Sequence, residues 1–156
     1  QMGPTKITPK YRHVSIYLQI LAASLIGAGH ALAAEPMANA CPVDGCEAKI
    51  LEVKKAGDEL ALTFKANFKP DVSKNHLHVW WGEQYDVKQV GRNATTFGVE
   101  KGKWHRHDDY PNYTTTGAAS TSIRDGAVTV CVTAADRNHN ILDASLYHCV
   151  DASTHL

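Results

Sequence analysis

The chain has 156 residues, 44% of them hydrophobic and 21% charged, and its 16 Lys and Arg residues balance its 16 Asp and Glu residues. Three of the basic residues (Lys6, Lys10 and Arg12) lie near the N-terminus, so the chain from residue 34 onward carries a net charge of −3. This mild acidity argues against binding to nucleic acid or to an anionic membrane surface, which basic proteins favour.

The N-terminal segment has the pattern of a secretory signal peptide. Its basic residues precede an uncharged, mostly apolar stretch that ends near the small-residue site Ala31-Leu32-Ala33. We expect residues 1–33 to be the signal and 34–156 to form one secreted or periplasmic domain. An uncleaved anchor is the alternative, because residues 14–34 reach the roughly 20 residues of a transmembrane helix. No later stretch of the sequence is long and apolar enough to span a bilayer.

Four cysteines lie after the expected signal, namely Cys41, Cys46, Cys131 and Cys149. An even number of cysteines in an exported domain predicts two disulfides, for which three pairings are possible. We favour Cys41–Cys46, which closes a short loop, and Cys131–Cys149. The alternative of a cysteine-rich metal site needs closer spacing than Cys131 and Cys149 have.

Short segments of alternating apolar and polar residues, separated by Gly, Asp, Asn and Pro, predict an all-β fold. The expected strands cover residues 48–54, 59–68, 76–81, 119–123, 127–135 and 142–150, with weaker ones near 85–90 and 104. Residues 91–117 lack a clear pattern, and we expect them to form a long irregular connection of the kind that often carries function.

A Cys131–Cys149 bond would set the register of the last two strands. In an antiparallel hairpin, Val132 then lies opposite His148, and Val130 opposite Val150. One face of the hairpin is aliphatic and the other carries Thr residues and the disulfide. This pattern is typical of a half-buried hairpin.

The segment 126–136 is a run rich in Val and Thr that ends in Asp136 and is followed by a polar turn and a returning strand. It resembles the final hairpin of immunoglobulin-like and polycystic-kidney-type β-sandwich domains. The resemblance implies an Ig-like antiparallel β-sandwich of about seven strands, and it implies no particular activity. The Cys…Trp…Cys pattern of antibody domains does not occur in the sequence.

Two His-X-His pairs are the strongest functional signal, His76-Leu77-His78 and His105-Arg106-His107. On a strand, residues i and i+2 project from one face about 6–7 Å apart, a spacing at which two imidazoles can share a metal ion. Neutral imidazole binds Cu(II) or Zn(II). We therefore predict an exported binding module whose metal site uses both pairs, with Asp108 or Asp109 in support. The open alternative is that the histidines are surface or hydrogen-bonding residues.

A second hypothesis rests on aromatic residues interleaved with polar ones. Strand alternation assigns Trp81 to the core and Trp80 to the opposite, outward face. Together with Trp104 and Tyr110, an exposed Trp80 would form a surface for a protein or glycan partner, as in an inhibitor or an envelope-associated factor.

The polar turn at residues 136–143 resembles the start of a calcium loop. It carries Ile141 where an EF-hand loop needs Gly, and Tyr147 where it needs Glu. We therefore do not expect calcium, and we predict a turn in which Asp and Asn cap their own backbone. Neither an HExxH nor a Gly-X-Ser-X-Gly motif occurs in the sequence, so catalysis is not expected.

Overall fold

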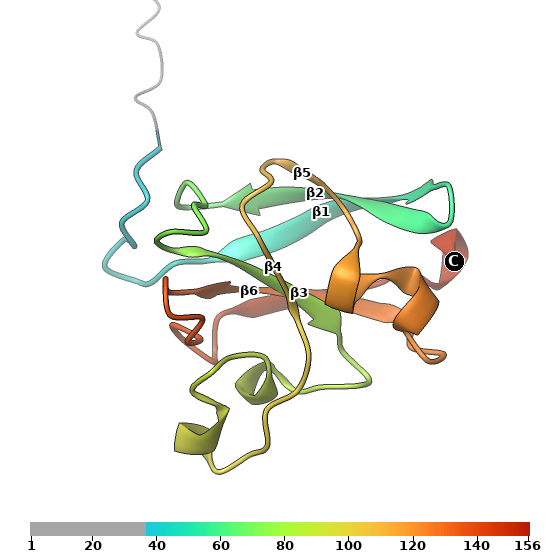
Figure 1. Cartoon of the computed structure of the whole chain (residues 1–156). Helices are drawn as coiled ribbons and strands as arrows, with labels where there is room; N and C mark the ends of the chain where they lie inside the picture. Colours follow the sequence, from blue (N-terminus) through green and yellow to red (C-terminus); the bar gives the residue numbers. More distant parts are fainter. Residues whose placement is uncertain (1–36) are drawn as a thin grey trace, which may run out of the picture. The chain divides into compact units, whose positions relative to one another are not determined.

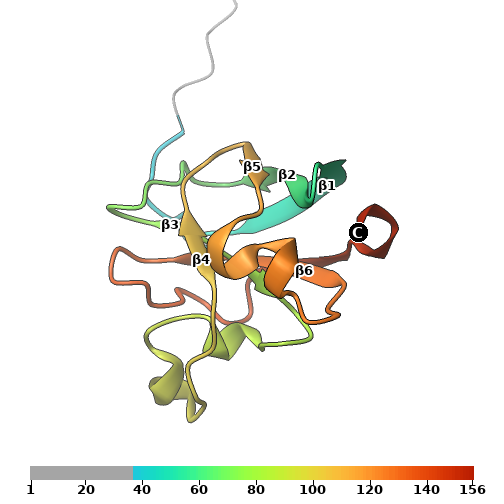
Figure 2. The same cartoon turned by 45° about the vertical axis from the view of Figure 1, so that its right-hand side comes forward.

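The computed structural model describes residues 37–156, so the expected signal and its cleavage site lie outside the described part. In these residues, seven strands form two antiparallel sheets, joined by turns and short 3-10 helices without an α-helix (Figures 1 and 2). The prediction of an all-β fold is confirmed. Among residues 37–156, no helix has the length and apolar character needed to cross a membrane.

The first sheet has the order β1-β2-β5 and contains β1 (Ala48–Ala56), β2 (Glu59–Ala66) and β5 (Asn112–Thr114). β1 and β2 form a hairpin whose turn uses Gly57 at φ +63°, a left-handed conformation that favours glycine. Alternate residues of β2 are buried, namely Leu60, Leu62, Phe64 and Ala66. Because β5 has only three residues inside an irregular stretch, the sequence pattern did not predict it.

The second sheet has the order β4-β3-β6-β7 and contains β3 (His76–Trp81), β4 (His105–His107), β6 (Thr129–Ala135) and β7 (Tyr147–Asp151). The register predicted for the last hairpin is confirmed, with Cys131 opposite Cys149. Both predicted disulfides, Cys41–Cys46 and Cys131–Cys149, are formed. Residues from both sheets, including Phe64, Leu77 and Val132, share one buried apolar cluster.

A second, smaller apolar cluster lies on the other face of the four-stranded sheet. The chain between β3 and β4 runs along the side of this sheet that faces away from the first sheet (Figures 1 and 2). It contains the 3-10 helices η1 (Val87–Gln89) and η2 (Ala94–Phe97). The buried members of the cluster are Trp80, Val87, Val90, Cys131, Ala135 and Ile141.

The expectation of an outward, exposed Trp80 is wrong, because this cluster buries it. Trp80 is 1% exposed, and its indole N–H donates to the carbonyl of Tyr85 at 2.8 Å. Alternation predicts which face of a strand a side chain takes, but it cannot show whether another segment covers that face. The Thr and disulfide face of the last hairpin is covered in β6 for the same reason, with Thr133 fully buried.

Two predicted strands are 3-10 turns instead. Residues 85–90 contain η1, because the Asp86 carboxylate accepts from the Lys88 N–H while the Gln89 side chain accepts from the Asp86 N–H. Residues 119–123 span the end of η3 (Gly117–Ala119) and all of η4 (Thr121–Ile123), and a last turn, η5 (Ser153–His155), follows β7.

The two disulfides should contribute unequally to stability. Cys131 and Cys149 are 18 positions apart, whereas Cys41 and Cys46 are 5 apart. The chain-entropy model then predicts that the Cys131→Ser/Cys149→Ser variant loses about 3 kcal/mol of unfolding free energy, and the Cys41→Ser/Cys46→Ser variant about 2 kcal/mol. Urea unfolding of both variants and the parent protein would measure this, and a larger loss from the N-terminal pair would contradict it.

Candidate metal centre

Three histidines from two separate parts of the chain meet on the outer face of the four-stranded sheet. His76 and His78 are alternate residues of β3, so they project from the same face. His139 lies in the turn between β6 and β7. This turn starts beside His76, because β6 ends at Ala135, the residue paired with His76.

The turn that carries His139 is held by its own polar groups. The Asp136 carboxylate accepts from the backbone N–H groups of Asn138 and Asn140, as the sequence predicted for a self-capping turn. His139 itself has φ +65°, and its carbonyl accepts from the Arg92 N–H at 2.8 Å. The backbone therefore fixes the position from which the His139 imidazole reaches β3.

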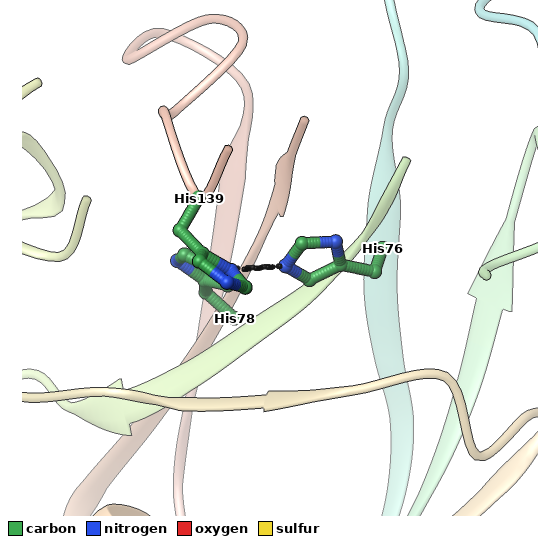
Figure 3. Close-up of side chains that lie close together, drawn as sticks. All are labelled: His76, His78 and His139. Carbon is green, nitrogen blue, oxygen red and sulfur yellow. Dashed lines mark hydrogen bonds between the residues drawn. The ribbon is translucent and has the colours of Figure 1, made fainter. Parts of the chain in front are cut away.

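The ring nitrogens of this histidine trio (His76, His78 and His139) converge, as Figure 3 shows. His76 Nε2 lies 3.1 Å from His78 Nε2 and 3.0 Å from His139 Nδ1, and one ligand atom from each residue lies within 4.8 Å of the others. Two nitrogens that each bind one ion at about 2.0–2.1 Å lie roughly 2.9–3.4 Å apart when their bonds make an angle of 90–110°. The trio can therefore hold a metal ion. His76 and His78 are 0% exposed and His139 is 8% exposed.

Backbone carbonyls orient the two β3 imidazoles. His76 Nδ1 donates to the Lys74 carbonyl at 3.1 Å, and His78 Nδ1 donates to the Val90 carbonyl at 2.6 Å. Each Nδ1 therefore carries the proton, and each Nε2 directs a lone pair toward the centre of the trio. Metal-binding histidines are commonly held by this kind of bond on the second ring nitrogen.

The proton positions on the three imidazoles leave one ring nitrogen, His78 Nε2, without a hydrogen-bond donor. The Arg106 guanidinium donates to His139 Nε2 at 2.8 Å, so a neutral His139 carries its proton on Nδ1 and donates it to His76 Nε2. His78 Nε2 then faces only another acceptor, His76 Nε2. A buried lone pair without a donor is unfavourable, and a metal ion would satisfy it.

Burial keeps the trio neutral, which is the form that binds metal. Removal from water lowers the pKa of His76 and of His139, and it lowers the pKa of His78 well below the ordinary value. Neighbouring imidazoles lower the pKa of His78 and His139 further. Ligand binding at neutral pH therefore needs no loss of an imidazolium proton.

The second predicted pair, His105 and His107, lies on the opposite face of the sheet. In the β3–β4 register, His107 is opposite Leu77 and His105 is opposite Val79. Directly opposed residues share a face, so this pair projects toward the first sheet, away from His76 and His78. The structure therefore does not bring the four predicted histidines to one ion.

His107 packs in the core, and His105 beside it is half-buried. The His107 ring stacks on Tyr113 at a centroid distance of 3.8 Å and lies 5.4 Å from the Phe64 ring. Neither of its ring nitrogens has a hydrogen-bond partner among the described residues, and burial, aided by His105, lowers the pKa of His107 to about 3. His105 Nδ1 and the Tyr113 hydroxyl form a hydrogen bond of 2.9 Å.

Asp108, predicted as a supporting ligand, is exposed and has another structural role. Its carboxylate accepts from the Val72 N–H at 3.0 Å, which ties the start of the chain after β4 to the loop before β3. It is not part of the histidine trio.

The predicted aromatic surface is also divided. Trp104 is half-buried and packs with the outer cluster, where its ring stacks on His78 at a centroid distance of 5.0 Å. Tyr110 is half-buried against the inter-sheet core, and its hydroxyl accepts from the Ala66 N–H at 3.0 Å. With Trp80 buried, the three residues do not form one exposed patch.

Sequence reasoning missed His139, because its neighbours matched a polar hairpin turn. The sequence does place His139 just after the strand expected at 127–135. That position brings it near His76 only because this strand pairs with β3, which the sequence does not show.

The chain matches no protein-family model, and comparison with curated proteins and with solved structures finds none that is similar. The candidate site therefore rests on geometry.

We predict that acid destabilises the protein through its buried histidines. Burial lowers the pKa of His107 to about 3 in the folded state, whereas the unfolded chain has the ordinary value near 6.5. The unfolded state thus binds more protons below about pH 6.5, so stability is fully present above that pH and falls as the pH drops.

Replacing His107 should remove its share of this effect. A His107→Phe variant keeps a ring against Tyr113 and loses only a weak contact with the Asp109 backbone, so its stability at about pH 8 should equal or exceed that of the parent. Between about pH 6 and pH 4, the free energy of unfolding of this variant should fall by about 1.4 kcal/mol less per pH unit than that of the parent protein. Urea unfolding across this range, with His155→Gln in η5 as the control, would measure it; unchanged acid sensitivity in His107→Phe would refute it.

Proposed function

We propose that this chain is an exported metal-binding domain that holds Cu(II) or Zn(II) on His76 Nε2, His78 Nε2 and His139 Nδ1. One observation carries the proposal. Two buried imidazoles, each fixed by a bond from Nδ1 to a backbone carbonyl, face each other through Nε2 lone pairs at 3.1 Å. A cation between them satisfies both.

The donor set favours these two ions. Three neutral imidazoles suit Cu(II) or Zn(II), whereas Mg(II) and Ca(II) prefer oxygen ligands. All four cysteines are in disulfides, so thiolate is not offered as a ligand. Three protein ligands also leave a coordination position for an exchangeable ligand, as in catalytic zinc sites.

We further propose that the fold is an Ig-like sandwich. The strand orders β1-β2-β5 and β4-β3-β6-β7 correspond to A-B-E and C′-C-F-G of that architecture. In this correspondence the histidine trio lies on the outer face of the C′-C-F-G sheet. A strand paired on both sides, as β3 is, provides a rigid frame for two of the three ligands.

Two observations support export. The two disulfides indicate an oxidising, extracytoplasmic environment. The signal-peptide pattern at residues 1–33 adds a route to the periplasm or to the medium.

Isothermal titration of chelator-treated protein with Cu(II) and with Zn(II) tests the metal site. We expect one ion per chain, together with a rise in melting temperature that follows mass action. His139→Asn should weaken uptake about a hundredfold or more, since it removes one of three ligands. Asn is the suitable replacement, because it tolerates the left-handed backbone at φ +65°.

A matched control uses the histidines on the inward face. The His105→Gln/His107→Phe double variant removes two imidazoles, one more than His139→Asn does, and it should keep the metal affinity of the parent protein because these side chains project away from the trio. Absence of uptake at micromolar protein, or loss of uptake in this control with retention in His139→Asn, would refute the proposed site.

A further inference from the structure

An open cavity of about 420 Å³ lies beside the histidine trio. It is lined by Arg92, Lys101, Trp104, His105, Arg106 and His139. The cavity contacts the trio at two points, through His139 itself and through Trp104, whose ring stacks on His78. Its volume lies in the range of sites that bind small molecules.

The lining of this cavity is strongly positive. It includes three cationic side chains and no carboxylate. Within residues 37–156, the ion pairs are Lys49–Glu47 and Lys54–Glu52, both on or next to β1. The charges of Arg92, Lys101 and Arg106 are therefore not neutralised by a carboxylate of the described chain within 4.0 Å, and such a cavity attracts anions.

Arg106 couples the cavity to the metal site. It lies opposite His78 in the β3–β4 register, so it projects from the same face as the trio. In the structure its guanidinium donates to His139 Nε2. Metal on His139 Nδ1 requires the proton on Nε2, and two donors cannot face each other at 2.8 Å. Metal binding therefore releases the guanidinium into the cavity.

We propose that the metal-loaded site takes a small anion, a carboxylate or an inorganic oxyanion, as its exchangeable ligand. The anion fills the coordination position that the three imidazoles leave open, and the released Arg106 guanidinium donates to it while Arg92 and Lys101 add positive charge. A guanidinium presents a planar pair of donors that suits such anions. This inference rests on the proposed function, because it requires the bound metal.

Azide titration of the Cu(II)-loaded protein provides the test, since azide bound to Cu(II) produces a charge-transfer band. We expect saturable azide binding that acetate displaces. Arg106→Gln should weaken azide binding about tenfold, because it removes a charge-assisted hydrogen bond. It should retain Cu(II) uptake at equal or higher affinity, because metal binding to His139 Nδ1 then breaks no Arg106–His139 hydrogen bond. Arg106 is exposed, so this variant keeps the fold.

Lys54→Gln is the matched control, because it removes one exposed positive charge on β1, far along the chain from the cavity lining. It should bind azide as the parent protein does. Equal azide affinity in the parent protein and Arg106→Gln, or a parent protein that binds Cu(II) but not azide, would overturn this inference alone. A parent protein that takes up no Cu(II) would overturn the proposed function with it.

Discussion

The structure depends on one constraint, the burial of β3 on both faces. All six of its residues are buried, with the first sheet against one face and the chain from residue 82 to 104 against the other. A strand in this position is commonly apolar throughout. Here it carries His76 and His78, so each buried ring nitrogen needs a partner. Backbone carbonyls satisfy the Nδ1 atoms, and the Nε2 atoms remain directed at each other.

The register between β3 and β4 explains why the two His-X-His pairs lie on opposite faces of the sheet. Both pairs lie on neighbouring strands, but the register places His107 opposite Leu77, one residue away from the alignment that would unite the pairs. A shift of one residue reverses the face of every side chain on a strand. His76 and His78 therefore meet His139, whereas His107 packs against Phe64 and Tyr113.

Local sequence patterns predicted the parts of the structure that local physics controls. The strand at 76–81 follows from alternation, and the register of the last hairpin follows from alternation together with the position of Cys131 and Cys149. Cys41–Cys46 was favoured because it closes a short loop. The main errors concern which segments cover a strand, and two further errors assigned strands to short 3-10 turns. Trp80 was expected to be exposed, and no pattern within β3 shows that Val87 and Val90 pack over it. By contrast, the spacing of Asp86 and Gln89 matches a capping box, so the sequence could have predicted the helical turn η1.

By itself the sequence determined the all-β class and the presence of two imidazoles on one face of a strand, and it favoured the disulfide pairing that the structure has. These properties depend on alternation with a period of two and on spacing along the chain. Only the tertiary structure decided which third imidazole joins His76 and His78. His139 lies 61 residues beyond His78 and reaches it because β6 pairs with β3, a contact between distant segments that chain spacing does not encode. The same pairing excluded His105 and His107 from the site.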